Sequence, residues 1–502
     1  MTSIQRPPHI YEINTWTWLH ALSEKYQRPI TLGSIPDAEL TALARPHTAF
    51  DAIWLMGVWE RSPRGAKIAR EHVGLQQDYS HALPDYQAED VVGSPYAVRG
   101  YVVDTRLGGP DELAVLRKRL RELGLGLILD FVPNHVALDH EWAITHPEAF
   151  LQGTAAELAA DPTSFAQIGE YIFALGRDPY FPAWTDTLQV NAFSPALRQL
   201  VIETLQNIAT QCDGVRCDMA MLEVSEVFAK TWGKRTGDVP SVEYWDEIIP
   251  QIRRYYPEFL FIAEVYWDME VRLHSLGFDY CYDKRLYDRM AHENATSVLT
   301  HLKAELEYQS KLIRFIENHD EMRAVVAFGV PRSKMAAVLV ATLPGAKLWH
   351  DGQTVGHKIK LPVQLARRPV EPSDKEISEF YRWLFSKVNQ PIYREGSWEL
   401  HEAIPAWPGN NSYHNMIAYI RRHKHDLRLI VVNFSNTQAQ CRVRLTNCGL
   451  EGKSWKLADK LNHRDYERNG DRMVEDGLYI DLTAWSAHIF EFSEGKLEHA
   501  PR

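Results

Sequence analysis

The chain is poor in cysteine, and the spacing of its cysteines is not that of a metal site. Only five occur in 502 residues, and the number is odd. No pair has the short spacing of a zinc site, and an odd count does not suit a disulfide framework. We therefore expect reduced, mostly buried thiols at Cys212, Cys217, Cys281, Cys441 and Cys448.

The chain also lacks long apolar runs and an excess of positive charge. No stretch of about 18 apolar residues occurs, so no transmembrane helix is expected. Residues 1–9 contain an arginine and two prolines but no apolar core of a signal peptide. The formal net charge of −11 argues against nucleic acid or an anionic membrane as the main partner. These absences predict a cytoplasmic protein; they do not indicate an oligomeric state.

What is present is a pattern of short apolar runs alternating with amphipathic helical segments, which predicts parallel β/α units. Ser194 and Pro195 form an N-cap signal for one helix, and Asp111 is expected to cap another. Eight strands with helices between them predict an α/β fold, a closed (β/α)8 TIM barrel, with its site at the C-terminal strand ends. The eight runs are 9–14, 51–56, 126–131, 214–218, 259–264, 278–282, 312–317 and 346–350.

Two regions depart from this alternation. Residues 136–193 follow the third run, show little periodicity and are too long for a simple connection, which indicates a small inserted subdomain. Beyond about residue 390 the runs 416–421, 427–434, 439–445, 479–482 and 488–492 resemble antiparallel strands. We therefore predict a barrel of residues 1–135 and 194–392, an insertion of 136–193, and a C-terminal β-sandwich of 393–502.

Three acidic residues stand at the ends of predicted barrel strands. Asp218 comes two positions after Arg216, so the two side chains share one face of the strand. A guanidinium beside a carboxylate lowers the pKa of that carboxylate, which suits a nucleophile. Glu264 closes the fifth run and Asp320 follows the seventh.

Each of these residues also has a structural interpretation. A single acid at a strand end is commonly a cap or loop residue, and Arg216 with Asp218 could form a structural ion pair. Three such acids at the same end of one barrel favour catalysis, because three independent coincidences would otherwise be needed.

Four short motifs contain these residues: DFVPNH at 130–135, GVRCD at 214–218, EVYW at 264–267 and NHD at 318–320. In this order and spacing they resemble the motifs of glycoside hydrolase family 13, the α-amylase family. GSPY at 93–96, QVN at 189–191 and VVNFS at 431–435 are similar to further segments of that family. The resemblance covers nearly the whole chain.

The resemblance implies a retaining mechanism in which Asp218 is the nucleophile, Glu264 the acid/base, and Asp320 a residue that binds sugar hydroxyls more tightly in the transition state. Apolar neighbours and a nearby anion are expected to raise the pKa of Glu264. Trp184 is a further candidate for a sugar contact. Substrate-binding residues implied by the motifs are Arg216, His135, His319, Tyr96, Trp267 and Asp130.

The sequence departs from the pattern of many α-amylases after the nucleophile. A Lys-His pair is replaced by Met221 and Leu222, which suggests a less polar acceptor side and weakens the expectation of calcium. No cofactor is required. Calcium is possible, with Asn134 as a ligand and Asp139 or Asp161 as candidate further ligands.

The leading hypothesis is a retaining enzyme that hydrolyses or transfers α-glucan or short α-glucosides. A disaccharide phosphorylase or synthase of the same fold is an alternative. A phosphorylase would need basic residues near the acceptor site, and basic residues on the loops after the seventh and eighth strands keep this open. A non-catalytic glycan-binding barrel is a second alternative, although such relatives have usually lost one of the three acids. The candidate basic residues are Arg323, Lys358, Lys360, Arg367 and Arg368.

Overall fold

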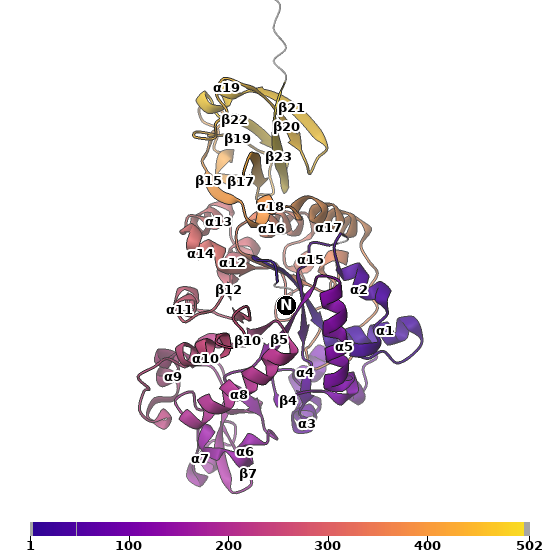
Figure 1. Ribbon diagram of the computed structural model, residues 1–502, viewed down its shortest axis with the longest axis vertical. Helices are drawn as coiled ribbons and strands as arrows, with labels where there is room; N and C mark the ends of the chain where they lie inside the picture. Colours follow the sequence, from indigo (N-terminus) through magenta and orange to yellow (C-terminus); the bar gives the residue numbers. More distant parts are fainter. Residues whose placement is uncertain (1–3, 47, 496–502) are drawn as a thin grey trace, which may run out of the picture.

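The computed structural model describes residues 4–46 and 48–495 (Figure 1). All eight predicted runs form strands of one closed parallel barrel, so the predicted fold class is confirmed. Several strands are shorter than their apolar runs, which leaves Asp218 and Glu264 one residue and Glu317 three residues beyond the end of their strands. The barrel strands are β1 (His9–Asn14), β2 (Ala52–Met56), β5 (Gly126–Phe131), β10 (Gly214–Cys217), β11 (Leu260–Ala263), β12 (Tyr280–Tyr282), β13 (Leu312–Arg314) and β14 (Ala346–His350).

The barrel strands form because most of their residues are apolar and buried on both faces; in β5 and β10 every residue is buried, including Asp130 and Arg216. Gly214 begins β10 where the next strand comes very close: a Cβ there would lie 2.6 Å from Cβ of Leu260. Ser194 caps α8 (Pro195–Gln211) as predicted. The cap predicted at Asp111 is wrong, because α5 (Gly109–Glu122) already begins after Gly108, whose positive φ of 113° suits glycine.

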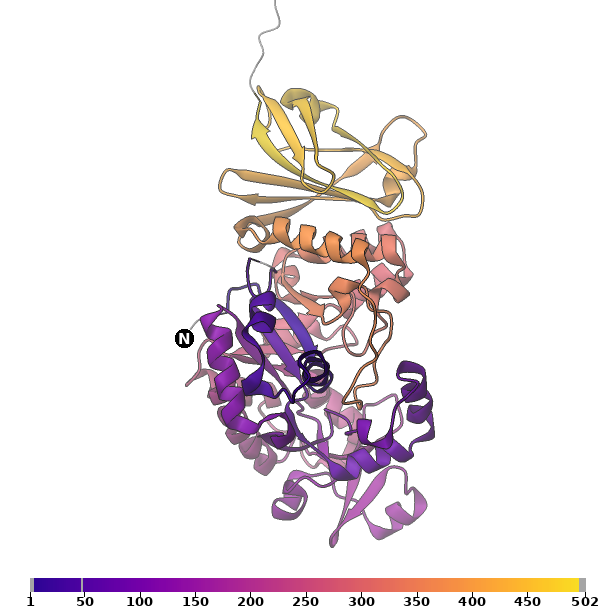
Figure 2. The same ribbon diagram turned by 90° about the vertical axis from the view of Figure 1, so that its right-hand side faces the viewer.

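Two groups of elements extend the barrel beyond its C-terminal strand ends. Residues of the predicted insertion form a four-stranded antiparallel sheet in the order β6-β9-β8-β7, which lies at the lower end of the molecule in Figure 1. Its strands are β6 (His135–Ala137), β7 (Phe165–Ile168), β8 (Tyr171–Gly176) and β9 (Trp184–Gln189). The helices α3 (Pro63–Glu71) and α4 (Val73–Ala82) lie near this sheet in Figure 2 and were not predicted. The domain limits given above remain predictions.

The C-terminal residues form a sandwich of two antiparallel sheets around their own apolar cluster. All five predicted runs are strands here, and four strands were missed. One sheet has the order β15-β17-β18-β23-β20-β21 and the other β16-β19-β22. The strands are β15 (Ser397–His401), β16 (Ala403–Pro405), β17 (Met416–His423), β18 (Asp426–Asn433), β19 (Ala439–Val443), β20 (Ser454–Asp459), β21 (Arg464–Asn469), β22 (Leu478–Leu482) and β23 (Ser486–Glu494).

Two barrel helices lie between the barrel and this sandwich (Figures 1 and 2). They are α16 (Val330–Thr342) and α17 (Lys375–Val388), and α16 contacts β18 and β23. Nearly all of α16 from Met335 onward is buried, and the hydroxyl groups of Thr342 and Tyr419 are 2.6 Å apart across the boundary. None of the described helices has the length and apolarity that a bilayer crossing needs.

Candidate active site

Arg216 lies in the barrel interior and holds two of the three acids. Its Nη1 is 2.6 Å from Oδ1 of Asp218, and its Nη2 is 2.8 Å from Oε2 of Glu264. The guanidinium is 1% exposed and lies 5.2–5.7 Å from the centres of three aromatic rings, those of Trp54, Tyr96 and Tyr282. Buried and enclosed by rings, one cation thus faces two carboxyl groups, and it cannot neutralise both.

Burial raises the pKa of Asp218 above its ordinary value, and the Arg216 guanidinium opposes this only in part. The charges of Asp320 and Asp130 add to the rise. The expected lowering of this pKa is therefore wrong in its net direction, because the cost of removing the carboxylate from water exceeds the gain from the cation. Asp218 ionises more readily when Glu264 is protonated, since the single cation then serves one anion.

Glu264 is held at both oxygens. The Met219 N–H donates to Oε2 over 2.7 Å, and the Tyr266 O–H donates to Oε1 over 2.8 Å. Burial raises the pKa of Glu264 to about 7, with Asp218 and Asp320 adding to the rise and Arg216 opposing it. This direction agrees with the sequence-based expectation. A carboxyl group with such a pKa can both give and take a proton near neutrality.

Asp320 stands at the open side of the site, where its side chain is 48% exposed. Its Oδ2 lies 3.0 Å from Nε2 of His319, and the opposite ring nitrogen, Nδ1, lies 2.5 Å from Oε1 of the buried Glu12. Burial alone would lower the pKa of His319, but these two carboxylates raise it well above its usual value. In turn, although its position in the pocket opposes ionisation, the His319 cation lowers the pKa of Asp320.

These acids line an open cavity of about 520 Å³ at the mouth of the barrel. Of the residues predicted from the motifs, Asp218, Glu264, Asp320, His135 and Tyr96 line it, as does the further candidate Trp184. The His135 ring is neutral, because burial lowers its pKa to about 4, and its centre lies 4.9 Å from that of Trp184. Of the predicted residues, the structure thus brings the three acids, one imidazole and two aromatic rings into one cavity.

Four other predicted residues lie outside the lining of this cavity. Arg216 lies beneath it, and His319 lies at its edge, where the Tyr96 hydroxyl is 2.7 Å from Nε2. Asp130 is 1% exposed, and its Oδ2 accepts the N–H of Gly57 over 3.0 Å, so it supports the backbone behind the site. Trp267 is turned outward and is 38% exposed.

The substitution of Met221 and Leu222 for a polar pair has another meaning than the sequence suggested. Both residues are buried, 0% and 3% exposed, and neither lines the cavity. They do not make the acceptor side apolar. Instead Met219, with a positive φ of 43°, lines the cavity and presents its N–H to Glu264.

Several cavity residues carry no motif and were missed. Ile68 and Ala69 come from α3, Leu75 from α4, His72 from the junction between these helices, Asp186 from β9, and Gln364 from the long loop after β14. Only the chain fold brings these segments together. Glu12 was also missed. It is an acidic residue within a predicted barrel strand, among apolar residues, and this pattern could have indicated a buried functional carboxylate.

The residues around Asn134 do not fit a calcium ion. The Asn134 Oδ1, the atom that would bind the metal, accepts an N–H of Gln189 over 2.9 Å. Asp139 accepts from Ser62, and Asp161 accepts from Thr163. Among the described residues, no three His, Cys, Asp or Glu side chains are grouped so that they could hold a metal. Calcium prefers several anionic oxygens together, which this region does not offer.

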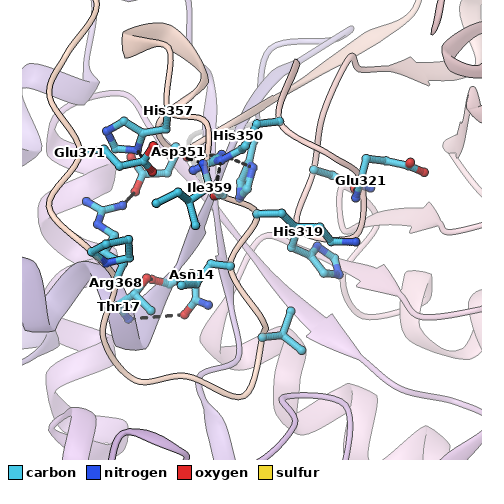
Figure 3. Close-up of a pocket in the computed structure, with 16 residues that line it drawn as sticks. Asn14, Thr17, His319, Glu321, His350, Asp351, His357, Ile359, Arg368 and Glu371 are labelled. Carbon is cyan, nitrogen blue, oxygen red and sulfur yellow. Dashed lines mark hydrogen bonds and ion pairs between the residues drawn. The ribbon is translucent and has the colours of Figure 1, made fainter. Parts of the chain in front are cut away.

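A second, narrower hollow lies beside His319 and is closed by the loop after β14 (Figure 3). Its two arginines are both paired with acidic residues. Arg323 Nη1 lies 2.6 Å from Glu317 Oε1 and donates to the Asp351 carbonyl over 2.8 Å, and Arg368 pairs with Asp351. These contacts join the loop after β13, which carries Asp320, to the loop after β14, which carries Gln364.

Comparisons with known proteins agree with this architecture. No protein-family model matches the chain. The chain is 20% identical over 309 residues to an alpha-amylase of Dictyoglomus thermophilum, which covers 58% of this chain and 59% of the relative. It is 25% identical over 485 residues to the 1,4-alpha-glucan branching enzyme GlgB of Corynebacterium jeikeium, covering 85% of this chain and 62% of the relative. The chain thus spans less than two thirds of the length of these curated relatives.

Solved structures resemble the chain along nearly its whole length. A maltogenic alpha-amylase of Thermotoga neapolitana has a TM-score of 0.67 at 18% identity, covering 97% of this chain and 98% of the other. An alpha-amylase of H. orenii has the same TM-score at 17% identity, covering 97% and 99%. At this level of identity the likeness establishes the shared fold.

Proposed function

We propose, from the premise that this chain is related to glycoside hydrolase family 13, the α-amylase family, that it is a retaining enzyme acting on α-glucans. The observation that carries the proposal is the contact of Asp218 and Glu264 with the two amino nitrogens of one guanidinium. This shared contact favours the short spacing of a retaining pair, about 5–5.5 Å, over the roughly 6.5–9.5 Å that an inverting pair needs to admit water.

In the first step the Asp218 carboxylate attacks the anomeric carbon and forms an ester with it. The bond from that carbon to the leaving oxygen breaks, and Glu264 gives its proton to this oxygen. The raised pKa of Glu264 keeps the proton available near neutrality. Once Glu264 is an anion, the Arg216 cation pairs with it, because Asp218 has lost its charge in the ester.

In the second step Glu264 takes a proton from the incoming hydroxyl group, which belongs to water or to another sugar. The oxygen of that group bonds to the anomeric carbon, and the ester bond to Asp218 breaks, which restores the starting state. Asp320 stands at the open side, where its carboxylate can bind sugar hydroxyls, and His319 contacts this carboxylate from behind through Nε2. Contacts that tighten as the sugar ring flattens would lower the barrier.

The cavity lining argues against the phosphorylase alternative. Among the described residues that line the cavity there is no arginine or lysine. Of the basic candidates, Arg323 pairs with Glu317, Arg367 with Asp85 and Asp90, and Arg368 with Asp351. Lys360 donates to the Asp320 carbonyl. A phosphate ion would need a free cation in the cavity, so water or a sugar hydroxyl is the better acceptor.

The test is a product analysis. The protein is incubated with starch, maltooligosaccharides, α-1,6 glucans, sucrose and trehalose, with and without phosphate, and the Asp218→Asn variant serves as control. We expect shorter or rearranged α-glucans whose newly formed anomeric centres keep the α configuration, and no sugar phosphate. The proposal fails if no substrate is converted, if the variant matches the parent, or if the first product has the β configuration.

A further inference from the structure

The cavity is bounded on one side by two segments that are far apart in the sequence. One is residues 62–94, which contains α3 and α4, and the other is residues 361–368 of the loop after β14. In Figure 2 this loop runs down to the two helices. Both segments line the cavity, through Ile68 and Leu75 of the helices and Gln364 of the loop. We call the two segments together the cavity wall.

Backbone hydrogen bonds join the two segments of the cavity wall. The Val92 N–H donates to the Gln364 carbonyl over 2.9 Å, and the Ala366 N–H donates to the Asp90 carbonyl over 2.7 Å. The residues between these bonds form an antiparallel bridge. Because Gln364 itself lines the cavity, this junction lies directly behind the lining.

Side chains close the same junction. Nε and Nη1 of Arg367 contact carboxylates of the other segment, Asp90 over 2.8 Å and Asp85 over 3.1 Å. Exposed ion pairs add little, so the junction depends on the backbone bonds and on an apolar cluster that α3, α4 and the loop share. A glucan chain cannot pass between segments that are packed in this way. The buried members of the cluster are Ala69, Tyr79, Leu83, Val91 and Leu365.

The cavity wall adjoins the residues that would hold the attacked sugar. Ser94, the last residue of its first segment, lines the cavity, and its Oγ accepts the Tyr96 N–H over 3.1 Å. The Tyr96 hydroxyl is 2.7 Å from Nε2 of His319, which also contacts Asp320. The loop after β14 reaches the same place, since Lys360 donates to the Asp320 carbonyl.

The leaving group belongs to another part of the cavity. Glu264, which gives its proton to the leaving oxygen, is held by the Met219 N–H and the Tyr266 hydroxyl, and both of these residues line the cavity. Neither residue belongs to the cavity wall. The reducing part of a substrate therefore departs past Glu264, and the non-reducing part of the chain points toward the wall.

We propose that the cavity wall ends the site beyond the attacked sugar, so that the protein acts at the non-reducing ends of α-glucan chains and does not cut within them. This inference rests on the proposed function. A chain that is cut in its middle must continue past the attacked sugar in both directions, and the wall leaves only the direction of the leaving group. Ile68 and Leu75, one from each helix, limit the length of the sugar that is released.

The test compares two maltoheptaosides that carry the same fluorescent label at the reducing end. One has a free non-reducing end, and in the other an ethylidene group blocks the 4- and 6-hydroxyls of that end. We expect kcat/KM for the blocked chain to be at least about a hundredfold lower, because the blocked end would have to displace packed side chains. Chromatography should show labelled products shortened stepwise from the free end. β-Cyclodextrin, which has no ends, should not be opened.

Ile68→Ala combined with Leu75→Ala enlarges the cavity at the wall and leaves the three acids in place. We expect this variant to raise the ratio of blocked to free cleavage about tenfold or to release longer sugars. The matched control is Val73→Ala, which shortens a side chain of α4 that is 68% exposed and does not line the cavity. The control should keep the ratio and the products of the parent, and melting temperatures verify that each variant is folded.

Equal cleavage of the blocked and free chains by the parent, or opening of β-cyclodextrin, would overturn the inference and leave the proposed function standing. A folded double variant with the ratio and the products of the parent would overturn the role of Ile68 and Leu75. If the parent converts neither chain nor starch, the proposed function itself fails, and the inference with it.

Discussion

Glu12 and His319 form a buried pair, with 2.5 Å between Glu12 Oε1 and His319 Nδ1. Glu12 lies on the first barrel strand and is 0% exposed, and its other oxygen has no hydrogen-bond partner among the described atoms. His319 bridges Glu12 to Asp320 at the open side of the cavity. Glu12 is thus a positioning residue, which fixes the ring that contacts Asp320 and keeps it protonated.

Replacing Glu12 by glutamine should lower the pKa of His319, because a neutral amide no longer stabilises the cation. We expect kcat/KM to fall about ten- to hundredfold, which is the worth of a buried charged hydrogen bond of roughly 1.5–3 kcal/mol. The other groups near His319 are Asp320, Tyr96 and Asp130, and they are unchanged. The measurement is a pH titration of the His319 ring by NMR, together with steady-state kinetics.

The sign of the pH effect follows from the raised pKa of His319. Its contribution to stability is fully present below the ordinary histidine pKa of about 6.5 and is lost as pH rises through the raised value. The Glu12→Gln variant should lose this contribution at lower pH than the parent. Glu223→Gln is the control, because Glu223 is equally buried and contacts neither His319 nor the cavity. An unaltered His319 titration in Glu12→Gln would refute the positioning role.

Tyr266→Phe removes the hydroxyl that donates to Oε1 of Glu264. A donor favours the ionised carboxylate, so its loss should raise the pKa of Glu264 above its value of about 7. Catalysis needs Glu264 protonated at the start, so the alkaline limb of kcat/KM should move to higher pH, by roughly one unit for a charged hydrogen bond. The references are the pH profiles of the parent and of Tyr255→Phe, which removes the hydroxyl of a tyrosine that is 60% exposed and does not line the cavity. A move to lower pH would contradict the assignment.

Glu264→Gln and Asp218→Asn should separate the two catalytic roles. Glu264→Gln is expected to lower kcat on starch about 10²–10⁴-fold. With an α-glucosyl fluoride, whose leaving group needs no proton, this variant should still form the ester at Asp218 and accumulate it, because no base activates water. Mass spectrometry of the intact protein would detect one added glycosyl group. Asp218→Asn should accumulate none, and labelling of that variant would sink the nucleophile assignment.

Chelation should leave the protein unaffected. The Asn134 Oδ1 is already occupied by a Gln189 N–H, so no calcium is expected to bind the folded state there. A ligand that binds only the folded state raises the melting temperature, and its removal lowers it. We therefore expect equal melting temperatures with EDTA and with added calcium. A lower melting temperature in EDTA would mean that a metal site exists elsewhere.

The sequence predicts the barrel well because each strand is a short apolar run whose ends carry the chemistry. The three acids converge because parallel strands all end at one rim. The strand β21 was missed because its residues, RDYERN, have no buried face and pair only at a sheet edge. The helices α3 and α4 and the loop that carries Gln364 reach the cavity only through long-range packing, which no local pattern reveals.

Local reasoning also misjudged two effects that depend on burial. The Arg216 cation was expected to decide the pKa of Asp218, but the depth of the site decides its net direction. Met221 and Leu222 were interpreted from their spacing after the nucleophile, whereas the turn at Met219 directs both into the core. Spacing along the chain predicts which face of a strand a side chain occupies, but it does not predict how deeply that side chain is buried.

The enclosure of α16 has a consequence for how the protein can be divided. This helix has one flank on the barrel and the other against β18 and β23, and Thr342 and Tyr419 join hydroxyls across that boundary. Deleting the C-terminal sheets would therefore uncover the apolar part of this helix, from Met335 to Ala341, on the surface of the barrel. The sandwich is part of the scaffold of the protein, and its removal would destabilise the barrel that it covers.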